Sequence, residues 1–341
     1  MSRMSKEESL ARDLGSRSPG RVALESSMVL CVQLVAVSGN AIVLLVIYKR
    51  PVIRTVTNTY IGALAICDLL MALAVMPWTA GSLISGGWMF GVSVCRLQGF
   101  LILLLAWTSL HIMALTAVNR YFRVVRPNLY RKYFTIRSSI NMIIVSMVTT
   151  IVVIATPLFA GWSSFVFRPG KATCFMTFDK SHGIAQHGYV IVNCVIYTFG
   201  PMILIYSCYF CVFMSVRNHV ISINPSLHSI LGVVPGAALT VREVRVTRAV
   251  FAMVLGFTWC WIPVTTIELL HVLTHGNLPR EGYLCFIYFA FISNAINPVI
   301  CISVNQTFRR ELFAVLPCGR ARQTTSELSI RNIVNNSVKP R

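Results

Sequence analysis

Seven long apolar stretches divide the sequence, and short polar segments separate them. A helix needs about 20 mainly apolar residues to cross a bilayer, because the hydrocarbon core is about 30 Å thick. Stretches of this kind occupy residues 28–48, 58–80, 94–118, 139–160, 188–216, 246–273 and 283–304. The pattern predicts an all-α membrane protein in which seven transmembrane helices form a bundle.

Lysine and arginine gather in alternate polar segments. The basic segments contain Lys49, Arg50, Arg54, Arg123, Arg126, Arg131, Lys132, Arg137, Arg242, Arg245, Arg248, Arg309, Arg310, Arg320 and Arg322. The segments on the other side hold few cations, with Arg168, Lys171 and Lys180 in one and Arg280 in another. Because basic loops stay in the cytoplasm, this asymmetry predicts a multi-pass plasma-membrane protein with an extracellular N-terminus.

Three regions follow from this pattern. Residues 1–27 are of mixed charge without an apolar core segment, so we expect a disordered extracellular segment and no secretory signal. Residues 28–304 form the predicted seven-transmembrane domain. Residues 305–341 begin with the basic amphipathic stretch NQTFRRELFAVLP, which predicts a short eighth helix before a cytoplasmic tail. Cys318 follows that stretch and is a candidate for palmitoylation.

The composition supports a membrane protein and changes the meaning of the net charge. Hydrophobic residues make up 55% of the chain and charged residues 12%, about half the charged fraction of a soluble domain. The net charge of +19 would suggest nucleic acid in a soluble protein. In a bundle it reflects cytoplasmic loops that face anionic lipid, so membrane lipid is the expected partner and nucleic acid is not.

Asp68 lies in the middle of the second stretch, where an ionisable group costs several kcal/mol. Two interpretations remain open, a carboxylate hydrogen-bonded across the bundle and a site for a small cation or a proton. Polar side chains at similar depth favour a sodium or water cluster, formed by Asp68, Ser109, Ser293, Asn294 and Asn297. A sodium ion at Asp68 is the one bound ion that we expect, and no organic cofactor is expected.

Arg120 lies at the predicted cytoplasmic end of the third stretch. It could extend its head group to the membrane surface, as long basic side chains often do, or it could act as a latch that changes partners when helices move. Glu243, just before the sixth stretch, is the candidate acid for such a latch. His111, in the middle of the third stretch, is expected to form an interhelical hydrogen bond.

Proline occurs inside five of the stretches. The positions are Pro77, Pro157, Pro201, Pro263 and Pro298. Proline removes a backbone hydrogen bond and kinks a helix, and in a membrane bundle it often marks a hinge or a cavity wall. Trp261 stands two residues before Pro263, either as an aromatic core residue or as part of such a hinge.

Two of the eleven cysteines are placed to form a disulfide. Cys95 begins the third stretch and Cys174 lies in the second extracellular loop, so both face an oxidising compartment. Their bond would tie that loop over the mouth of the bundle. Most of the others lie in the apolar stretches and are expected to pack as small hydrophobic residues.

These features together resemble the rhodopsin-like, or class A, G-protein-coupled receptors. The resemblance covers residues 39 to about 310, with the motifs in the order of the family. They are Gly39-Asn40-x-x-Val43, Leu64-Ala65-x-x-Asp68, the Cys95 and Cys174 pair, Asn119-Arg120-Tyr121, Pro201 with Tyr209, Phe257-x-x-Cys260-Trp261-x-Pro263, Asn297-Pro298 and Asn305-x-x-Phe308-Arg309.

The resemblance implies a receptor that transmits an extracellular ligand signal to a heterotrimeric G protein by opening the cytoplasmic side of the bundle. The implied switch residues are Asn119, Arg120, Tyr121, Tyr209, Glu243, Trp261, Pro263, Asn297, Pro298 and Cys301. The implied ligand pocket consists of Gln98, Ile102, Asn193, Tyr197, Trp261, Thr265, Glu268, His271 and Ile287. Glu268 and His271 share a helical face, where they could form a solvated pair at the helix mouth or Glu268 could meet a cation-bearing ligand, which is the sharper hypothesis.

The sequence departs from the family pattern at several positions. Asn119 replaces the usual acid before Arg120, and Cys301 replaces the usual tyrosine. The seventh stretch has no lysine, so a retinal Schiff base is not expected. Ile102 stands where amine receptors keep an aspartate, which argues against a simple biogenic amine.

The sequence also loosely resembles the subgroup of melatonin-type receptors, through Asn119-Arg120-Tyr121 and through Ala160-Gly161 after Pro157. Leu158 and Phe178 occupy places where that subgroup keeps asparagine and glutamine. These two differences argue against melatonin itself as the ligand.

Other classes of function are less consistent with the residues. A transporter or channel would need a continuous polar path, and Asp68 alone supports one poorly. An enzyme is not expected, because no metal cluster or nucleophile pair occurs at mid-depth. Within the receptor fold, the altered switch positions leave open a decoy or a constitutively active receptor.

Overall fold

The computed structural model describes residues 5–178, 188–189, 192–193, 195–222, 241–273 and 278–315. Seven helical stretches in these residues are long and apolar enough to cross a membrane, as the sequence predicts. They are formed by α2 (Pro19–Lys49), α3 (Val56–Ala74) with α4 (Met76–Ser85), α5 (Gly91–Val125), α7 (Ile136–Phe159), η3 (Val195–Phe199) with α9 (Gly200–Ser222), α10 (Val241–Leu273) and α11 (Arg280–Val304).

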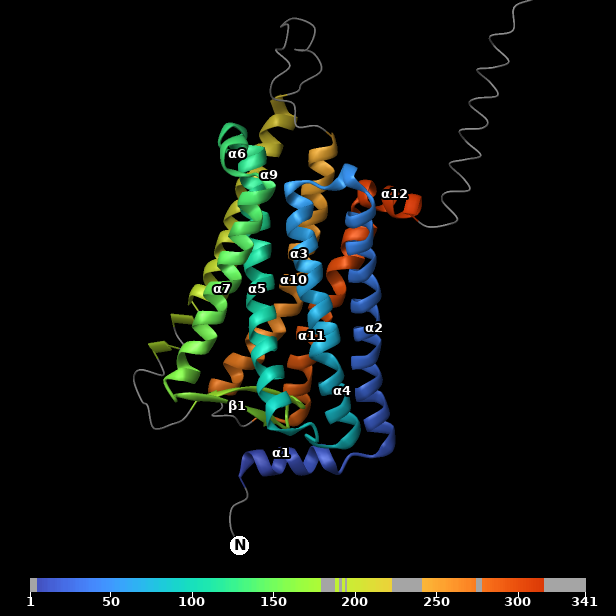
Figure 1. The fold of residues 1–341 in the computed structure, drawn as a ribbon, viewed down its shortest axis with the longest axis vertical. Coiled ribbons are helices and arrows are strands. Elements are labelled where there is room, and N and C mark those ends of the chain that lie inside the picture. The colour runs from blue at the N-terminus through green and yellow to red at the C-terminus, as the bar shows by residue number, and fades with distance from the viewer. Residues whose placement is uncertain are drawn as a thin grey trace, which may run out of the picture.

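The remaining elements lie at the two ends of this bundle (Figure 1). One end, here the hairpin end, bears α1 (Lys6–Gly15) and the antiparallel strands β1 (Ser163–Arg168) and β2 (Thr173–Phe178). The opposite end, here the α12 end, bears η1 (Pro51–Ile53), α6 (Pro127–Tyr133) and α12 (Gln306–Val315). A transmembrane bundle therefore separates two polar faces, as alternation of apolar and polar segments dictates.

The bundle is held by apolar side chains that face inward, with α5 near its centre. This helix contacts α3, α7, α9 and the hairpin. Other large apolar side chains point outward, and Leu34, Phe210 and Trp259 are each more than half exposed. A water-soluble protein rarely shows so continuous an apolar surface, whereas lipid tails would cover it.

Proline interrupts the helices where the sequence predicts it, although not always as a kink. The second span breaks at Val75, which ends α3, and α4 restarts with Pro77 in its first turn. Before Pro201, five residues form a π-helical turn that leads into α9. The break at Val75 and the π-helical turn each accommodate a proline, which has no backbone N–H to donate. Pro157, Pro263 and Pro298 lie inside continuous helices.

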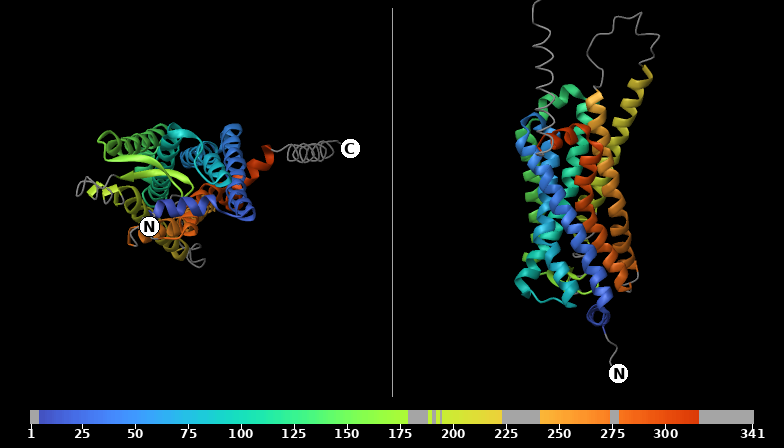
Figure 2. Two further views of the ribbon diagram at one scale, coloured as in Figure 1. Left: turned by 90° about the horizontal axis from the view of Figure 1, so that it is seen from below. Right: turned by 90° about the vertical axis from the view of Figure 1, so that its right-hand side faces the viewer.

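The prediction that the N-terminal segment is disordered is wrong for residues 5–27, which the structure describes. Ser5 and Glu8 cap α1 reciprocally, each side chain bonding the other residue's backbone N–H, and such a capping box nucleates a helix. Leu10 and Leu14, one turn apart, are both buried. Figure 2 shows α1 lying across the hairpin end. The first span also begins earlier than expected, because Ser18 caps α2 ahead of Pro19.

The hairpin adds a two-stranded sheet to this helical structure. Strands β1 and β2 pair from Ser163↔Phe178 to Arg168↔Thr173. The turn between them contains Ala172 at a φ of +49°, a conformation that costs a non-glycine residue energy and that the surrounding contacts must hold. The turn is thereby fixed in one orientation, toward the bundle.

Candidate functional site

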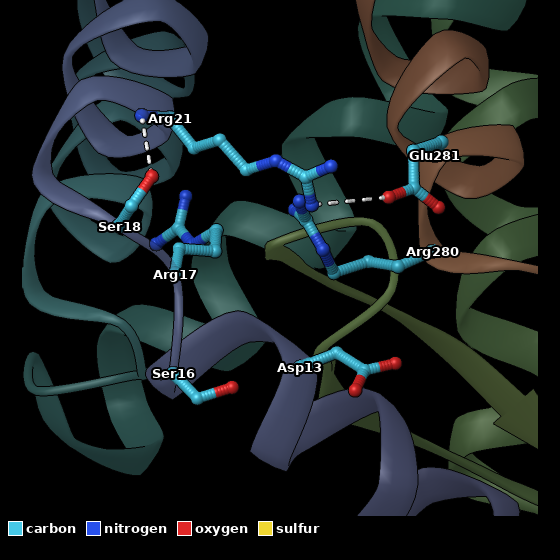
Figure 3. Close-up of a pocket in the computed structure, with 7 residues that line it drawn as sticks. All are labelled: Asp13, Ser16, Arg17, Ser18, Arg21, Arg280 and Glu281. Atoms are coloured by element: carbon cyan, nitrogen blue, oxygen red, sulfur yellow. Dashed lines mark hydrogen bonds and ion pairs between the residues drawn. The ribbon is translucent and has the colours of Figure 1, made fainter.

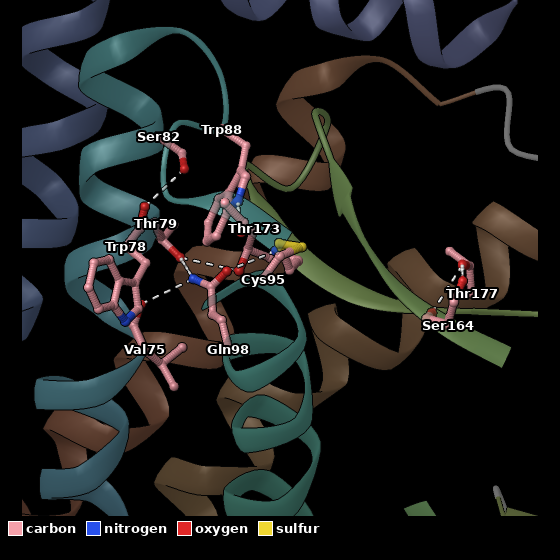
Figure 4. The surroundings of a disulfide bond; sticks show 12 residues. Val75, Trp78, Thr79, Ser82, Trp88, Cys95, Gln98, Ser164, Thr173 and Thr177 are labelled. Atoms are coloured by element: carbon pink, nitrogen blue, oxygen red, sulfur yellow. Dashed lines mark hydrogen bonds between the residues drawn. A yellow bond between two sulfur atoms is a disulfide. The ribbon is translucent and has the colours of Figure 1, made fainter. Parts of the chain in front are cut away.

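A disulfide and a buried glutamine fix the hairpin to the bundle (Figure 4). The predicted bond between Cys95 and Cys174 is present. Gln98, fully buried one turn along α5, accepts from the Cys174 N–H at 2.9 Å and donates to the Thr79 hydroxyl at 3.0 Å and the Val75 carbonyl at 3.2 Å. The hydrogen bonds of Gln98 join α5 to α4, to β2 and to Val75 between α3 and α4, and its contact with a ligand stays a prediction.

Lys171, in the hairpin turn, reaches into the mouth of the bundle. Its Nζ lies 3.0 Å from a Glu268 carboxylate oxygen. The same atom lies 4.1 Å from the centre of the Phe175 ring and 3.8 Å from that of Phe286. Burial lowers the pKa of the Lys171 ammonium, and the Glu268 carboxylate opposes that shift. An amino acid of the chain itself therefore occupies the place predicted for a cationic ligand.

The predicted pair of Glu268 and His271 is divided between two partners. Glu268 faces Lys171, whereas His271 Nδ1 lies 2.7 Å from the Tyr283 hydroxyl at the start of α11. Tyr283 also packs against Gly170, where an added Cβ would lie 2.7 Å from its ring. The two residues share a helical face as predicted, but each joins α10 to a different neighbouring element.

The other predicted pocket residues lie below this mouth and are largely packed. Ile102, Ile287, Asn193 and Tyr197 are buried. The hydroxyl of Thr265 and the amide of Asn193 donate to carbonyls one turn earlier in the chain. These residues line the bundle interior without forming one polar site.

Trp261 stacks on Phe257 at 5.3 Å between ring centres, on the same helix. Tyr197 contacts Trp107 at 5.0 Å and His111 at 4.9 Å. The expected interhelical hydrogen bond of His111 is wrong, because Nδ1 lies 2.7 Å from the Trp107 carbonyl of its own helix. A histidine in an apolar span finds its nearest acceptor one turn earlier.

Asp68 forms part of the predicted polar cluster at mid-depth. Asn297 Nδ2 donates to its Oδ2 at 2.9 Å, and the two side chains are 1% and 4% exposed. Ser293 and Asn294 instead bond carbonyls of α11. Ser109 is buried, and no described hydrogen bond joins it to Asp68. The cluster therefore consists of one interhelical pair with other polar groups nearby.

The first motif, Gly39-Asn40, joins the first span to the last span. Asn40 Nδ2 donates to the Asn294 carbonyl at 3.0 Å. One residue earlier, an added Cβ on Gly39 would lie 2.7 Å from Pro298. Only glycine lets α2 and α11 approach this closely.

Arg120 is 1% exposed, so it does not extend to the membrane surface. Its Nη2 donates to Asn119 Oδ1 at 3.3 Å, and the same oxygen accepts from the Thr57 hydroxyl at 3.1 Å. Tyr209 on α9 is buried and packs against Phe251 of α10. Asn119 therefore links Arg120 to α3 without a charge of its own.

The remaining switch positions vary in exposure. Tyr121 is half-buried with its ring edge-on to Phe122 at 5.3 Å, and Cys301 is buried. The backbone of Glu243 lies in α10, whereas its side chain lies outside the described residues, so its pairing with Arg120 stays a prediction.

The predicted eighth helix is α12. Asn305 accepts the Phe308 N–H at 3.1 Å and starts the helix, while Phe308 is buried. Glu311 accepts from Arg50 at 2.7 Å and from Arg310 at 3.2 Å. Burial alone would raise the pKa of the Glu311 carboxyl, but hydrogen bonds to these two arginines outweigh burial and hold the pKa below its usual value. Cys318 lies outside the described residues.

A charged network at the hairpin end was not foreseen from the sequence. Glu25 accepts from Arg17 at 2.6 Å and from Arg280 at 2.9 Å, and both arginines are almost fully buried. A cleft of about 440 Å³ lies beside it (Figure 3), lined by Asp13, Ser16, Arg17, Ser18, Arg21, Arg280 and Glu281. No local signal connects Glu25 with an arginine 255 residues away.

Comparison with known proteins decides the family. The model of the rhodopsin family of seven-transmembrane receptors matches residues 39–300, which is most of the chain. This chain belongs to that family. It is accordingly a multi-pass plasma-membrane receptor that couples an extracellular ligand to a G protein, and not an enzyme. A transporter or channel is not favoured.

Several named receptors are similar to this receptor over most of their length. The high-affinity lysophosphatidic acid receptor of Xenopus laevis is 25% identical, over 89% of this chain and 87% of its own. Somatostatin receptor type 5 of Bos taurus is 27% identical, over 88% and 78%. These identities are too low to transfer a ligand. Neither is a melatonin receptor, so the finer resemblance to that subgroup stays a prediction.

The crystal structure of squid rhodopsin has the same fold. It superposes with a TM-score of 0.75 and 22% identity, covering 90% of this receptor and 89% of that chain. The shared fold explains why residues far apart in the sequence come together in the bundle.

Proposed function

We propose that this receptor receives its ligand at the hairpin end, outside the cell, and contacts a heterotrimeric G protein at the α12 end. The basic segments that contain Lys49, Arg131 and Arg309 lie at the α12 end, which favours the cytoplasm for that face. The disulfide at the hairpin end favours an oxidising compartment for the other.

The observation that carries this proposal is the burial of Arg120 beside Asn119 at the α12 end. The buried Arg120 guanidinium contacts protein groups in place of water. Opening of the α12 end would expose it in a polar groove. An apolar helix of the G protein would enter that groove beside it. Ligand binding would shift the population of a pre-existing open state, with α10 moving about Pro263.

The test is nucleotide exchange on purified G proteins by the receptor in lipid nanodiscs. We expect Arg120→Ala to lower basal exchange at least tenfold while the helical circular dichroism signal is retained. The matched control is Arg96→Ala, which removes an exposed arginine at the opposite end and should leave exchange unchanged. Equal exchange by both variants would contradict the assigned role of Arg120.

We further propose a sodium ion at Asp68. No described ion pair includes this buried carboxylate, so it must keep a proton or bind a cation. Asn297 Oδ1 and Ser109 Oγ are buried oxygens that accept no described hydrogen bond, and such orphaned atoms point to an ion or water. Asp68, Ser109 and Asn297 would hold the ion through their oxygens.

Sodium chloride should therefore raise the thermal midpoint of the receptor by several degrees relative to potassium chloride at equal ionic strength. Asp68→Asn keeps the shape of the side chain and should abolish this difference. Asp13→Asn changes an exposed acid on α1 and should preserve it. A sodium effect that survives Asp68→Asn would exclude the site.

A further inference from the structure

The mouth of the receptor contains a site for an ammonium group, and that site is already occupied. Lys171 Nζ faces the rings of Phe175 and Phe286 at 4.1 and 3.8 Å and the Glu268 carboxylate at 3.0 Å. Aromatic faces attract cations within about 6 Å, and this combination is how proteins recognise organic ammonium ligands. Three elements supply the site, namely β2, α10 and α11.

The chain holds Lys171 in this place by several independent constraints. The Lys171 N–H donates to the Arg168 carbonyl at 3.0 Å, and the next residue, Ala172, is buried in a left-handed conformation. Gly170 packs directly against the Tyr283 ring. The disulfide at Cys174 ties the following strand to α5. The turn is thus preorganised to present one ammonium group to the bundle.

The Glu268 side chain is open to solvent, although the Lys171 side chain that it binds is buried. The Lys171 side chain is 9% exposed, whereas the Glu268 side chain is 45% exposed. A ligand arriving from solvent could therefore engage the free side of the carboxylate before Lys171 withdraws. This acid also lies on α10, away from Ile102, so an ammonium ligand here would bind without the acid that amine receptors use.

We propose that Phe175, Phe286 and Glu268 form a binding site for a small organic ammonium, which Lys171 occupies as a tethered ligand. An external ammonium must compete with a group whose effective concentration is that of an intramolecular reaction, in the millimolar range or above. This inference rests on the proposed function only for its signalling consequence, because binding can be measured separately.

The experiment removes the tethered group and supplies it from solution. Lys171→Ala deletes the atoms from Cγ to Nζ, which n-propylammonium reproduces. In the full-length receptor in nanodiscs, we expect Lys171→Ala to lower the thermal midpoint by several degrees, and n-propylammonium to restore at least half of the loss in a saturable manner. The wild-type receptor should not respond at the same concentrations. Lys49→Ala, at an exposed lysine of the opposite end, should neither lose stability nor respond.

Two controls separate ammonium recognition from cavity filling. The neutral analogue 1-propanol should restore no stability to Lys171→Ala, and adding Glu268→Gln should abolish rescue by n-propylammonium. Rescue by propanol to the same extent, or rescue that persists with Glu268→Gln, would overturn the proposal. Absence of any rescue in a folded Lys171→Ala receptor would overturn it as well.

A second measurement applies if Lys171→Ala does not fold. Acetylation of the wild-type receptor, followed by peptide mass spectrometry, should modify Lys171 at least tenfold more slowly than Lys49, and Glu268→Gln should accelerate modification of Lys171. Equal rates for the two lysines in the wild type would overturn the proposal.

Nucleotide exchange distinguishes failure of this inference from failure of the proposed function. Rescue of stability in a receptor that never promotes exchange would leave the site intact and contradict the function. Normal exchange without rescue of stability would contradict the site alone. If the ammonium site and the proposed function are both correct, n-propylammonium should return the basal nucleotide exchange of Lys171→Ala toward the wild-type rate.

Discussion

Asn119 places a neutral amide where the family usually has an acid. Its contacts show how this replacement affects Arg120. One oxygen accepts from both Arg120 and Thr57, so the residue still positions the buried arginine and also joins α5 to α3. An asparagine oxygen carries no formal charge, so its hydrogen bond to the Arg120 guanidinium lacks the Coulomb attraction that a carboxylate would add. The restraint on Arg120 is therefore retained, although it is weaker than the one that the usual acid would provide.

Asn119→Asp should lower basal nucleotide exchange by about three- to tenfold, because a carboxylate would hold the Arg120 guanidinium more strongly in the closed state. The measurement is exchange by purified receptor and G protein at equal receptor concentration. Asn128→Asp places the same charge on an exposed position of α6 and should change exchange less. Unchanged or increased exchange in Asn119→Asp would show that Arg120 is not restrained by its neighbour.

At the scale of elements, two short helices are attached to the bundle by arginine–glutamate contacts. Arg17 connects the end of α1 with α2 and α4, since it bonds the Leu14 carbonyl, Glu25 and the Leu83 carbonyl. At the opposite end, Arg50 joins α2 to Glu311 of α12. Apolar anchors accompany each contact, with Leu10 and Leu14 in α1 and Phe308 in α12.

Arg17→Ala should release α1 from the hairpin end, because three buried acceptors would lose a charged donor. Glu25 keeps Arg280, so the cost is that of lost hydrogen bonds, about 2 kcal/mol, and not of an unpaired buried charge. We expect amide hydrogen exchange within residues 6–15 to accelerate at least tenfold. Arg12→Ala, on the exposed face of the same helix, should leave exchange unchanged.

The attachment of α12 should weaken in acid. The pKa of Glu311 is lowered in the folded receptor, so its ionised form contributes stability that is fully present above the unfolded value of about 4.3 and is lost as pH falls through the lowered pKa. The thermal midpoint of the wild type should therefore exceed that of Glu311→Gln at pH 7, by an amount that shrinks below about pH 4. A difference independent of pH would contradict the role of the ionised carboxylate.

At the scale of the whole molecule, the hairpin end is closed by segments that come from distant parts of the sequence. The hairpin is joined to α5 by the disulfide and to α10 through Lys171, and Arg168 pairs with Glu7 of α1 at 3.3 Å. The mouth of the bundle is therefore one connected structure. A ligand that enters it must displace contacts that join the hairpin, α1 and the transmembrane helices.

Replacing both Cys95 and Cys174 by alanine should lower stability by up to about 4.5 kcal/mol, the chain-entropy value for a bond with a sequence separation of 79. Thermal unfolding should show a lower midpoint, and reducing agent should then have no further effect. Cys285→Ala, at a free and exposed cysteine, should behave like the wild type. An unchanged midpoint would show that Gln98 and the hairpin contacts hold this end by themselves.

The sequence by itself determined the seven spans, the disulfide and the amphipathic eighth helix. These depend on local apolar length, on periodicity and on motif residues, and each is confirmed. The positions of Asp68 and Asn297 were also predictable, because a polar side chain in an apolar span requires a partner at the same depth.

Only the tertiary structure decided which partner each polar side chain has. Gln98 holds the hairpin through the Cys174 N–H, and Glu268 meets Lys171, 97 residues away. The order of Ser5 to Glu8 did encode a capping box, but the docking of α1 depends on burial of Leu14 by distant elements. The packing of whole helices decides which side chains pair across the bundle. A single sequence gives the side chains but not the distances between them in the folded bundle.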